Sequence, residues 1–241
     1  MCIRDRTGIW LLDSKQFVRW KVNAASRLWL YGIPGCGKTI LSSTVIEALL
    51  QHCRDDTSMV TAYFYFDFND TRKQDPELML RSLLLQLLQR LVIIPKGVNA
   101  LSSSPMNAQQ QPSLHALLEV TLQVMQQFTH VYIVLDALDE CTQLLELIKV
   151  LETIAGWQLD NVHLLMTSRK ERDIESSLNS YVKEKDTVHL QGNVVDEDIQ
   201  RYVRQRLSDD KGLAKWNKDA DIRQEIEAAL MSGACGMYVV T

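Results

Sequence analysis

A glycine-rich loop near the start of the chain has the residue types and the spacing of a phosphate-binding site. Gly32 and Gly37 are separated by four residues and are followed by Lys38 and Thr39, with an apolar run before the loop and a helix-compatible segment after it. Glycines let successive backbone N–H groups converge on phosphate oxygens, and the helix start adds partial positive charge. The pattern predicts that this loop binds the phosphates of a nucleotide.

Each position of the loop has an expected role. Lys38 would reach the β- and γ-phosphates, and the Thr39 hydroxyl would bind Mg²⁺. Cys36 occupies a position that favours a small side chain. A glycine-rich turn without a ligand is the alternative, and the strand and helix on either side argue against it. The expected nucleotide-binding residues are Gly32, Pro34, Gly35, Cys36, Gly37, Lys38, Thr39 and Ile40.

A second motif, "HVYIVLDALDEC", supplies three carboxylates after a strand-like run. Asp136 would lie at the carboxyl end of a buried strand, where open α/β sheets bind their ligands. There it is expected to hold Mg²⁺ together with Thr39. Asp139 and Glu140 follow within one turn, and one of them would polarise the attacking water. Alternatively, these two carboxylates only cap the next helix and interact with its dipole.

A third motif, "HLLMTSRKERDIE", brings a guanidinium to the same sheet edge. Its apolar strand ends in Thr167, Ser168 and Arg169. Arg169 would sense or stabilise a γ-phosphate. It could equally be a solvated arginine of the charged run from Arg169 to Asp173.

Alternating strand-like and helix-like segments position these motifs and predict an α/β domain with a parallel sheet. Asp75 and Pro76 read as the N-cap and first residue of the clearest helix, which carries one leucine stripe. The stripe is Leu80, Leu83, Leu84, Leu87, Leu88 and Leu91. The expected strands are Leu28 to Tyr31, Val60 to Phe66, Val131 to Leu135, Val162 to Thr167 and Thr187 to Leu190.

The chain divides by pattern into three parts: a lead-in segment (1–26), a nucleotide-binding domain (27–193) and the start of an all-α domain (194–241). The polar stretch from Pro95 to Ser113 is expected to be a surface loop or flexible insert. In the third part, Ile199, Tyr202, Val203 and Leu207 share one helix face, as do Ile222, Ile226, Ala229 and Leu230. This part is too short to complete a helical domain, so we expect it to continue beyond the sequence given.

Composition gives no support to some classes of partner. The chain has 26 basic and 30 acidic residues among 241, so no net positive field favours a nucleic acid or an anionic membrane. The most apolar stretch is interrupted by Arg81, Gln86, Gln89 and Arg90, which argues against a membrane span. Five scattered cysteines are typical of a reducing compartment. We therefore expect a soluble, cytoplasmic protein.

Taken together, these motifs resemble the NACHT family of signal-transduction NTPases. The similarity is strongest to the nephrocystin-type NACHT modules of fungal NOD-like receptor proteins. It extends from Gly8 to Thr241 and includes "TGIWLLDSKQFVRW", "GIPGCGKTILSS", "AYFYFDFNDTRKQ", "VLDALDEC", "LLMTSR" and "GMYVV".

The resemblance implies a P-loop NTPase fold with a five-stranded parallel sheet in the order 5-1-4-3-2, followed by a helical domain that closes over the nucleotide. It implies that Asp136 holds Mg²⁺, that the small Ala137 leaves room near the site, that Asp139 and Glu140 are the acidic pair, and that Arg169 is the sensor. The family's winged-helix, repeat and effector domains are not recognisable in this sequence, so the sensed ligand and the output are not encoded here.

Two classes of function fit these features. In the first, ADP holds a closed state and ATP with Mg²⁺ favours an open state that self-associates, with slow hydrolysis as the reset. In the second, the chain is a turnover ATPase or a small-molecule kinase, although no arginine-rich lid follows Arg172. A GTPase is disfavoured, because Ala220 stands where a base-reading aspartate would follow Asn217 and Lys218. A degenerate scaffold is disfavoured because Lys38, Thr39, Asp136 and Glu140 are all present.

Overall fold

The computed structural model describes residues 8–91, 93, 95, 98, 112–191, 197–201, 203–205 and 220–234. Within these ranges lies a five-stranded parallel sheet with the strand order β2-β3-β4-β1-β5. Its strands are β1 (Arg27–Gly32), β2 (Met59–Tyr65), β3 (His130–Asp136), β4 (Val162–Ser168) and β5 (Thr187–Leu190). The predicted order and all five predicted strands are confirmed.

The strand order brings the predicted site motifs to one edge of the sheet. β4 lies between β1 and β3, and its residues are buried along its whole length, as a central parallel strand requires. The register pairs Tyr31 with Ser168, and Leu135 with Met166. The phosphate loop after β1, Asp136 at the end of β3 and Arg169 after β4 therefore meet at the carboxyl edge.

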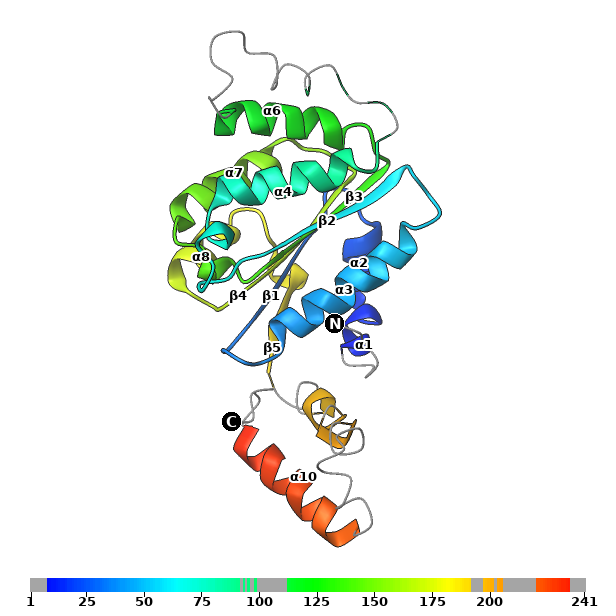
Figure 1. The fold of residues 1–241 in the computed structure, drawn as a ribbon, viewed down its shortest axis with the longest axis vertical. Coiled ribbons are helices and arrows are strands. Elements are labelled where there is room, and N and C mark those ends of the chain that lie inside the picture. Colours follow the sequence, from blue (N-terminus) through cyan, green and yellow to red (C-terminus); the bar gives the residue numbers. More distant parts are fainter. Residues whose placement is uncertain are drawn as a thin grey trace.

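Helices cover both faces of the sheet (Figure 1). One face carries α4 (Pro76–Leu88), α6 (Leu114–Met125), α7 (Leu144–Gly156) and α8 (Arg172–Leu178), which share a core with β2 and β3. The other carries α1 (Ile9–Leu12), α2 (Lys15–Val22) and α3 (Lys38–His52), which form a second core with β1. Short 3₁₀ turns are η1 (Thr71–Lys73), η2 (Leu138–Glu140) and η3 (Glu184–Asp186). The described part of the lead-in segment, from residue 8 onwards, thus packs against the sheet beside α3.

The helix α4 begins and packs as its sequence predicts. The Asp75 carboxylate accepts hydrogen bonds from the backbone N–H groups of Glu77 and Leu78, and Pro76 is the first helical residue. Of the leucine stripe, Leu80, Leu83, Leu84 and Leu87 are buried. Leu88 and Leu91 are partly buried against the same core. Most of the predicted insert from Pro95 to Ser113 lies outside the described residues.

The described residues of the last part of the chain are helical. They comprise 197–201 and 203–205 and the helix α10 (Ala220–Ala234), which Figure 1 shows beyond the β5 end of the sheet. Of the two predicted faces, Ile199 and Val203 are buried, and Ile226 and Leu230 are partly buried against the second core. Ala229, on the second predicted face, is exposed. Tyr202 and Leu207 lie outside the described side chains.

None of the helices in the described ranges combines the length and the apolar composition needed to span a membrane.

Candidate nucleotide-binding site

The phosphate loop has a backbone that only glycine adopts easily. Gly35 and Gly37 have φ angles of 75° and 90°, in the left-handed region. At Gly32 the constraint is close approach, because an added Cβ would lie 2.6 Å from the Cys36 sulfur and 2.9 Å from the Leu190 carbonyl oxygen. The glycines of the predicted motif are therefore required by the shape of the loop.

Lys38 lies folded over this loop. Its Nζ atom donates hydrogen bonds of 2.9 Å to the carbonyl oxygens of Gly32 and Ile33. Cys36 is buried beneath the ammonium, and burial raises the pKa of its thiol. The ammonium is thus held at the loop by neutral carbonyl groups, which an anionic phosphate would replace as stronger partners.

Asp136 is the centre of a hydroxyl network that joins three elements. Its Oδ2 atom accepts a hydrogen bond of 2.7 Å from Thr39, in the first turn of α3. Its Oδ1 atom accepts from Ser42 at 2.6 Å and from Thr167 of β4 at 2.7 Å. The side chain is 2% exposed, so these bonds satisfy a carboxylate that is removed from water.

Sequence reasoning missed the roles of Ser42 and Thr167. The available signals were a second hydroxyl one turn after Thr39 and a polar residue at the end of an apolar strand. Thr167 also accepts a hydrogen bond of 2.9 Å from the backbone N–H of Ala137, which has a left-handed φ of 58°. The strand-to-turn transition after Asp136 is therefore fixed by its neighbour β4.

Thr39 and Asp136 fit the requirements of Mg²⁺. They supply hard oxygen atoms 2.7 Å apart beside the phosphate loop. Mg²⁺ is usually bound through one or two carboxylates together with substrate phosphates and water. The described residues hold no cluster of three or more His, Cys, Asp or Glu side chains suited to a metal. The chemistry of this donor set matches a metal that is bound together with a nucleotide.

Asp139 and Arg169 form a two-point contact across the carboxyl edge. Asp139 Oδ1 accepts from the backbone N–H of Arg169 at 2.9 Å, and Asp139 Oδ2 pairs with Arg169 Nε at 2.9 Å. The Asp139 side chain is 3% exposed, whereas that of Arg169 is 47% exposed. Asp139 is therefore engaged in holding Arg169, and it fixes the direction of the guanidinium.

Glu140 has a different environment from its neighbour. Its Oε2 atom accepts one hydrogen bond, of 3.1 Å, from the backbone N–H of Phe68 in the β2–α4 connection. Burial, and then the nearby carboxylates of Asp139, Asp67 and Asp136, raise the pKa of Glu140. A raised pKa suits a residue that accepts a proton from water. Phe68 was missed, and no sequence signal marks a backbone donor in a loop.

Most of the predicted site residues line one cavity of about 260 Å³. Its lining comprises Pro34, Gly35, Gly37, Lys38, Thr39, Ile40, Ala137, Asp139, Glu140 and Arg169. Three predicted site residues, Gly32, Cys36 and Asp136, lie outside this lining, and Cys36 and Asp136 are buried. The structure thus brings together the Lys38 ammonium, the glycine loop, the Thr39 hydroxyl, the Glu140 carboxylate and the guanidinium that Asp139 positions.

Comparison with known families agrees with this geometry. The family model described as "Nephrocystin 3, N-terminal" matches residues 6–169. The chain belongs to this family. It is a NACHT-type P-loop NTPase of the STAND class, as its motifs indicated. A relative, the vegetative incompatibility protein HET-E-1 of Podospora anserina, is 26% identical over 95% of this NACHT-type chain. The chain spans only 17% of that relative's length.

Solved structures share the fold of this NACHT-type chain. The Aeropyrum pernix ORC2 protein, in ADPNP and ADP complexes, is 14% identical with a TM-score of 0.51, covering 86% of this chain and 52% of that one. A Walker-type ATPase of Pyrococcus abyssi is 13% identical with a TM-score of 0.50, covering 90% of this chain and 60% of that one. At these identities the likeness establishes the P-loop α/β fold alone.

Proposed function

We propose that this NACHT-type module binds ATP and ADP with Mg²⁺ and acts as a nucleotide-dependent switch in a cytoplasmic signalling protein of the NOD-like receptor type. The ATP state would favour self-association, and slow hydrolysis would return the module to the ADP state. The observation that carries the proposal is the convergence of the phosphate loop, Glu140 and the fixed Arg169 on one cavity.

In this proposal, each residue of the site has a separate role. Lys38 exchanges its carbonyl partners for phosphate oxygens, and the backbone of the loop surrounds the same phosphates. Asp136 and Thr39 would hold Mg²⁺, which supplies positive charge to the phosphate oxygens. Glu140 accepts a proton from the attacking water, and Arg169 stabilises negative charge on the γ-phosphate side. Asp139 acts through Arg169 and is a positioning residue.

The last part of the chain supports a switch over a turnover enzyme. We propose that residues 27–193 form the nucleotide domain after a lead-in of residues 1–26, and that residues 194–241 begin the helical domain. The described helical residues contact the lead-in segment through Asp198, which accepts hydrogen bonds from Gly8 and Trp10. A nucleotide that alters this arrangement would bias two states of the molecule, as a switch requires.

Glu140→Gln tests the hydrolytic and the switching roles together. The amide keeps the size of the side chain but cannot accept the proton, so phosphate release should fall at least a hundredfold while ATP affinity stays within about threefold. The ATP-loaded variant should then accumulate as an oligomer. Malachite-green phosphate assays, calorimetry with ATP and light scattering measure the three effects.

Glu47→Gln is the matched control, because Glu47 is exposed on α3 and lies outside the cavity. It should behave as the unchanged protein in all three measurements. Undiminished phosphate release by Glu140→Gln would refute the role of Glu140 as base. Fast turnover by a protein that remains monomeric in ATP would favour a turnover ATPase or kinase over the switch.

A further inference from the structure

A second polar cavity lies at the opposite edge of the sheet from the phosphate loop. It has a volume of about 170 Å³ and is located where β1 begins, whereas the phosphate loop follows the end of β1. Residues of α2, of the α2–β1 connection and of the segment from Tyr181 to Asp186 form its walls. None of its lining residues belongs to the candidate nucleotide site.

Three residues that line this cavity each carry a buried hydrogen-bonding atom without a partner. In the described ranges, the buried side-chain nitrogen and oxygen atoms without a partner are Arg19 Nε, Trp20 Nε1 and the Tyr181 hydroxyl. All three residues line the cavity. The two nitrogens can only donate hydrogen bonds. Leaving such groups unpaired is costly, so turning these side chains towards an acceptor in the cavity would be favourable.

The Tyr181 hydroxyl is also kept as a donor by its surroundings. Burial is the main cause that raises the pKa of this phenol, and the nearby Glu152 carboxylate adds to it. The Arg27 guanidinium lies 5.8 Å from the centre of the Tyr181 ring and donates to the carbonyl oxygens of Ala25 and Ala155. The phenol therefore stays protonated at neutral pH and can donate its hydrogen to a bound anion.

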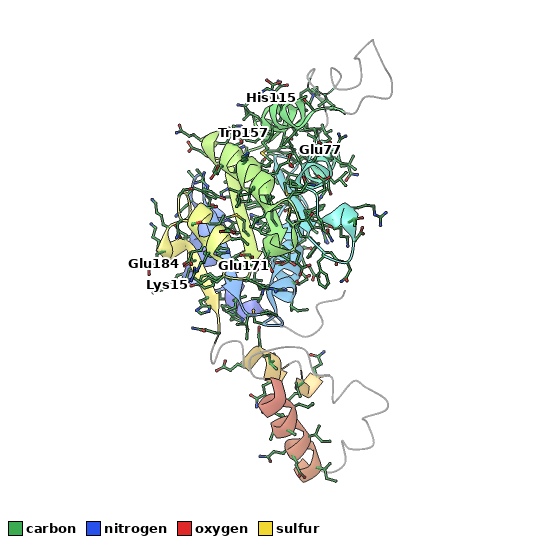
Figure 2. The ribbon with its side chains drawn as sticks, turned by 90° about the vertical axis from the view of Figure 1, so that its left-hand side faces the viewer. Lys15, Glu77, His115, Trp157, Glu171 and Glu184 are labelled. Atoms are coloured by element: carbon green, nitrogen blue, oxygen red, sulfur yellow. The ribbon has the colours of Figure 1, made fainter. Side chains whose placement is uncertain are left out.

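The lining of the cavity also has a net positive charge, which favours an anion as the acceptor for these donors. Arg19, Arg27, Lys183 and Lys185 contribute four positive charges and Asp186 one negative charge, a net value of +3. Asp186 lies 3.6 Å from an Arg19 terminal nitrogen, so the only carboxylate of the lining is already paired. Figure 2 labels Lys15 of α2 and Glu184 of η3 on the same side of the molecule, and the Arg19–Asp186 pair joins these elements.

We infer that this cavity binds a doubly charged oxyanion of the phosphate class, as free phosphate or as the phosphate of a monoester. The donors, the positive lining and the guanidinium groups all suit phosphate oxygens. The volume is smaller than that of ordinary small-molecule pockets, so the cavity would take the phosphate group and leave any attached group outside. Lys183 and Lys185 are exposed and would meet the ligand first. The bound anion would connect α2 to the segment that leads into β5.

Calorimetric titration with inorganic phosphate tests this site, with ADP and Mg²⁺ in excess so that the phosphate loop is occupied. We expect saturable binding to one site. Tyr181→Phe removes only the hydroxyl and should weaken this binding about tenfold, which corresponds to one charge-assisted hydrogen bond. Arg19→Gln should weaken it at least as much. Lys21→Gln is the matched control, because Lys21 lies on the same helix but lines a different cavity, and it should bind phosphate normally.

A parallel titration with glycerol 2-phosphate distinguishes the two sources of the anion. Equal affinity for the monoester would identify a phosphorylated partner or metabolite as the ligand class, and binding of inorganic phosphate alone would identify the free anion. Thermal melts give a second measure, since phosphate should raise the melting temperature of the unchanged protein more than that of Tyr181→Phe. No saturable binding, or binding that neither Tyr181→Phe nor Arg19→Gln weakens, would overturn the inference.

Discussion

At the scale of single residues, two adjacent carboxylates have different environments. Asp139 has both oxygens engaged with Arg169 and a side chain that is 3% exposed. Glu140 accepts one backbone hydrogen bond and has a raised pKa, mainly because of burial. Two neighbouring acids in such different environments commonly have separate functions. The geometry thus favours Glu140 as the base and Asp139 as the residue that places Arg169, a choice that the sequence left open.

Asp139→Asn tests the positioning role. The amide oxygen can still accept from the Arg169 backbone, but the negative charge that holds the guanidinium is lost. If Arg169 contacts the γ-phosphate, affinity for ATP should fall about tenfold while affinity for ADP stays within about twofold. Calorimetry with both nucleotides measures the ratio of the ATP affinity to the ADP affinity. Arg172→Gln, an exposed charge change three residues further along, should leave the ratio intact. An equal loss for both nucleotides would contradict a γ-phosphate role for Arg169.

At the scale of elements, the strands could be predicted well and the side-chain contacts between them could not. Buried parallel strands are continuous apolar runs, and strand, loop and helix alternate at recognisable spacings, so the sheet and the ends that carry Asp136 and Arg169 were found. The hydroxyls of Ser42 and Thr167 reach Asp136 from other elements. Such contacts depend on register and rotamer, which apolar patterning does not encode.

Two histidines near the starts of β3 and β4 show another contact of this kind. The buried His163 ring lies 2.8 Å from His130, nitrogen to nitrogen, and its other nitrogen contacts Ser26 and the Trp20 carbonyl oxygen. Burial, and then the neighbouring His130, lower the pKa of His163 to about 4. His163 is therefore neutral in the folded protein at pH values where an unfolded chain would protonate it. It links α2 to the sheet in a pH-dependent way.

Stability should accordingly fall in mild acid because of His163. Between pH 6.5 and pH 4 the unfolded chain binds a proton that the folded chain does not, so the free energy of unfolding decreases as the pH falls. From pH 6.5 to pH 5 this group should account for about 2 kcal/mol. Urea unfolding of the unchanged protein and of His163→Asn at pH 7 and pH 5 measures this change in the free energy of unfolding. The variant should lose most of the change. His115→Asn, at an exposed position, should keep the same pH dependence of stability as the unchanged protein. If His163→Asn also kept that dependence, groups other than His163 would cause it.

At the scale of the whole molecule, the first described residues contact the helical segment of residues 197–201. Asp198 is 2% exposed and accepts hydrogen bonds from the Gly8 backbone at 2.7 Å and from Trp10 Nε1 at 2.9 Å. Gly8 in turn packs against Leu41 and Thr44 of α3, the helix that begins at the phosphate loop. A continuous path of contacts therefore connects the nucleotide cavity to the helical segment. Gly8 and Asp198 are 190 positions apart in the sequence, so no local pattern could have predicted their contact.

If the proposed switch moves the helical segment away from the lead-in, the Trp10–Asp198 hydrogen bond stabilises the closed state. Trp10→Phe keeps most of the apolar contact and removes the donor. The loss of a hydrogen bond to a carboxylate, about 1.5 kcal/mol, should shift the equilibrium towards the open state roughly tenfold. The oligomer should then form at a lower ATP concentration in light scattering. Trp157→Phe, on the α7 side of the sheet (Figure 2), is the matched control and should assemble as the unchanged protein does. Assembly of Trp10→Phe at the same ATP concentration as the control would contradict this role. The contact would then either persist in both states or fail to restrain the helical segment. In both cases the contacts from Asp198 to the nucleotide would contribute no free energy to the switch.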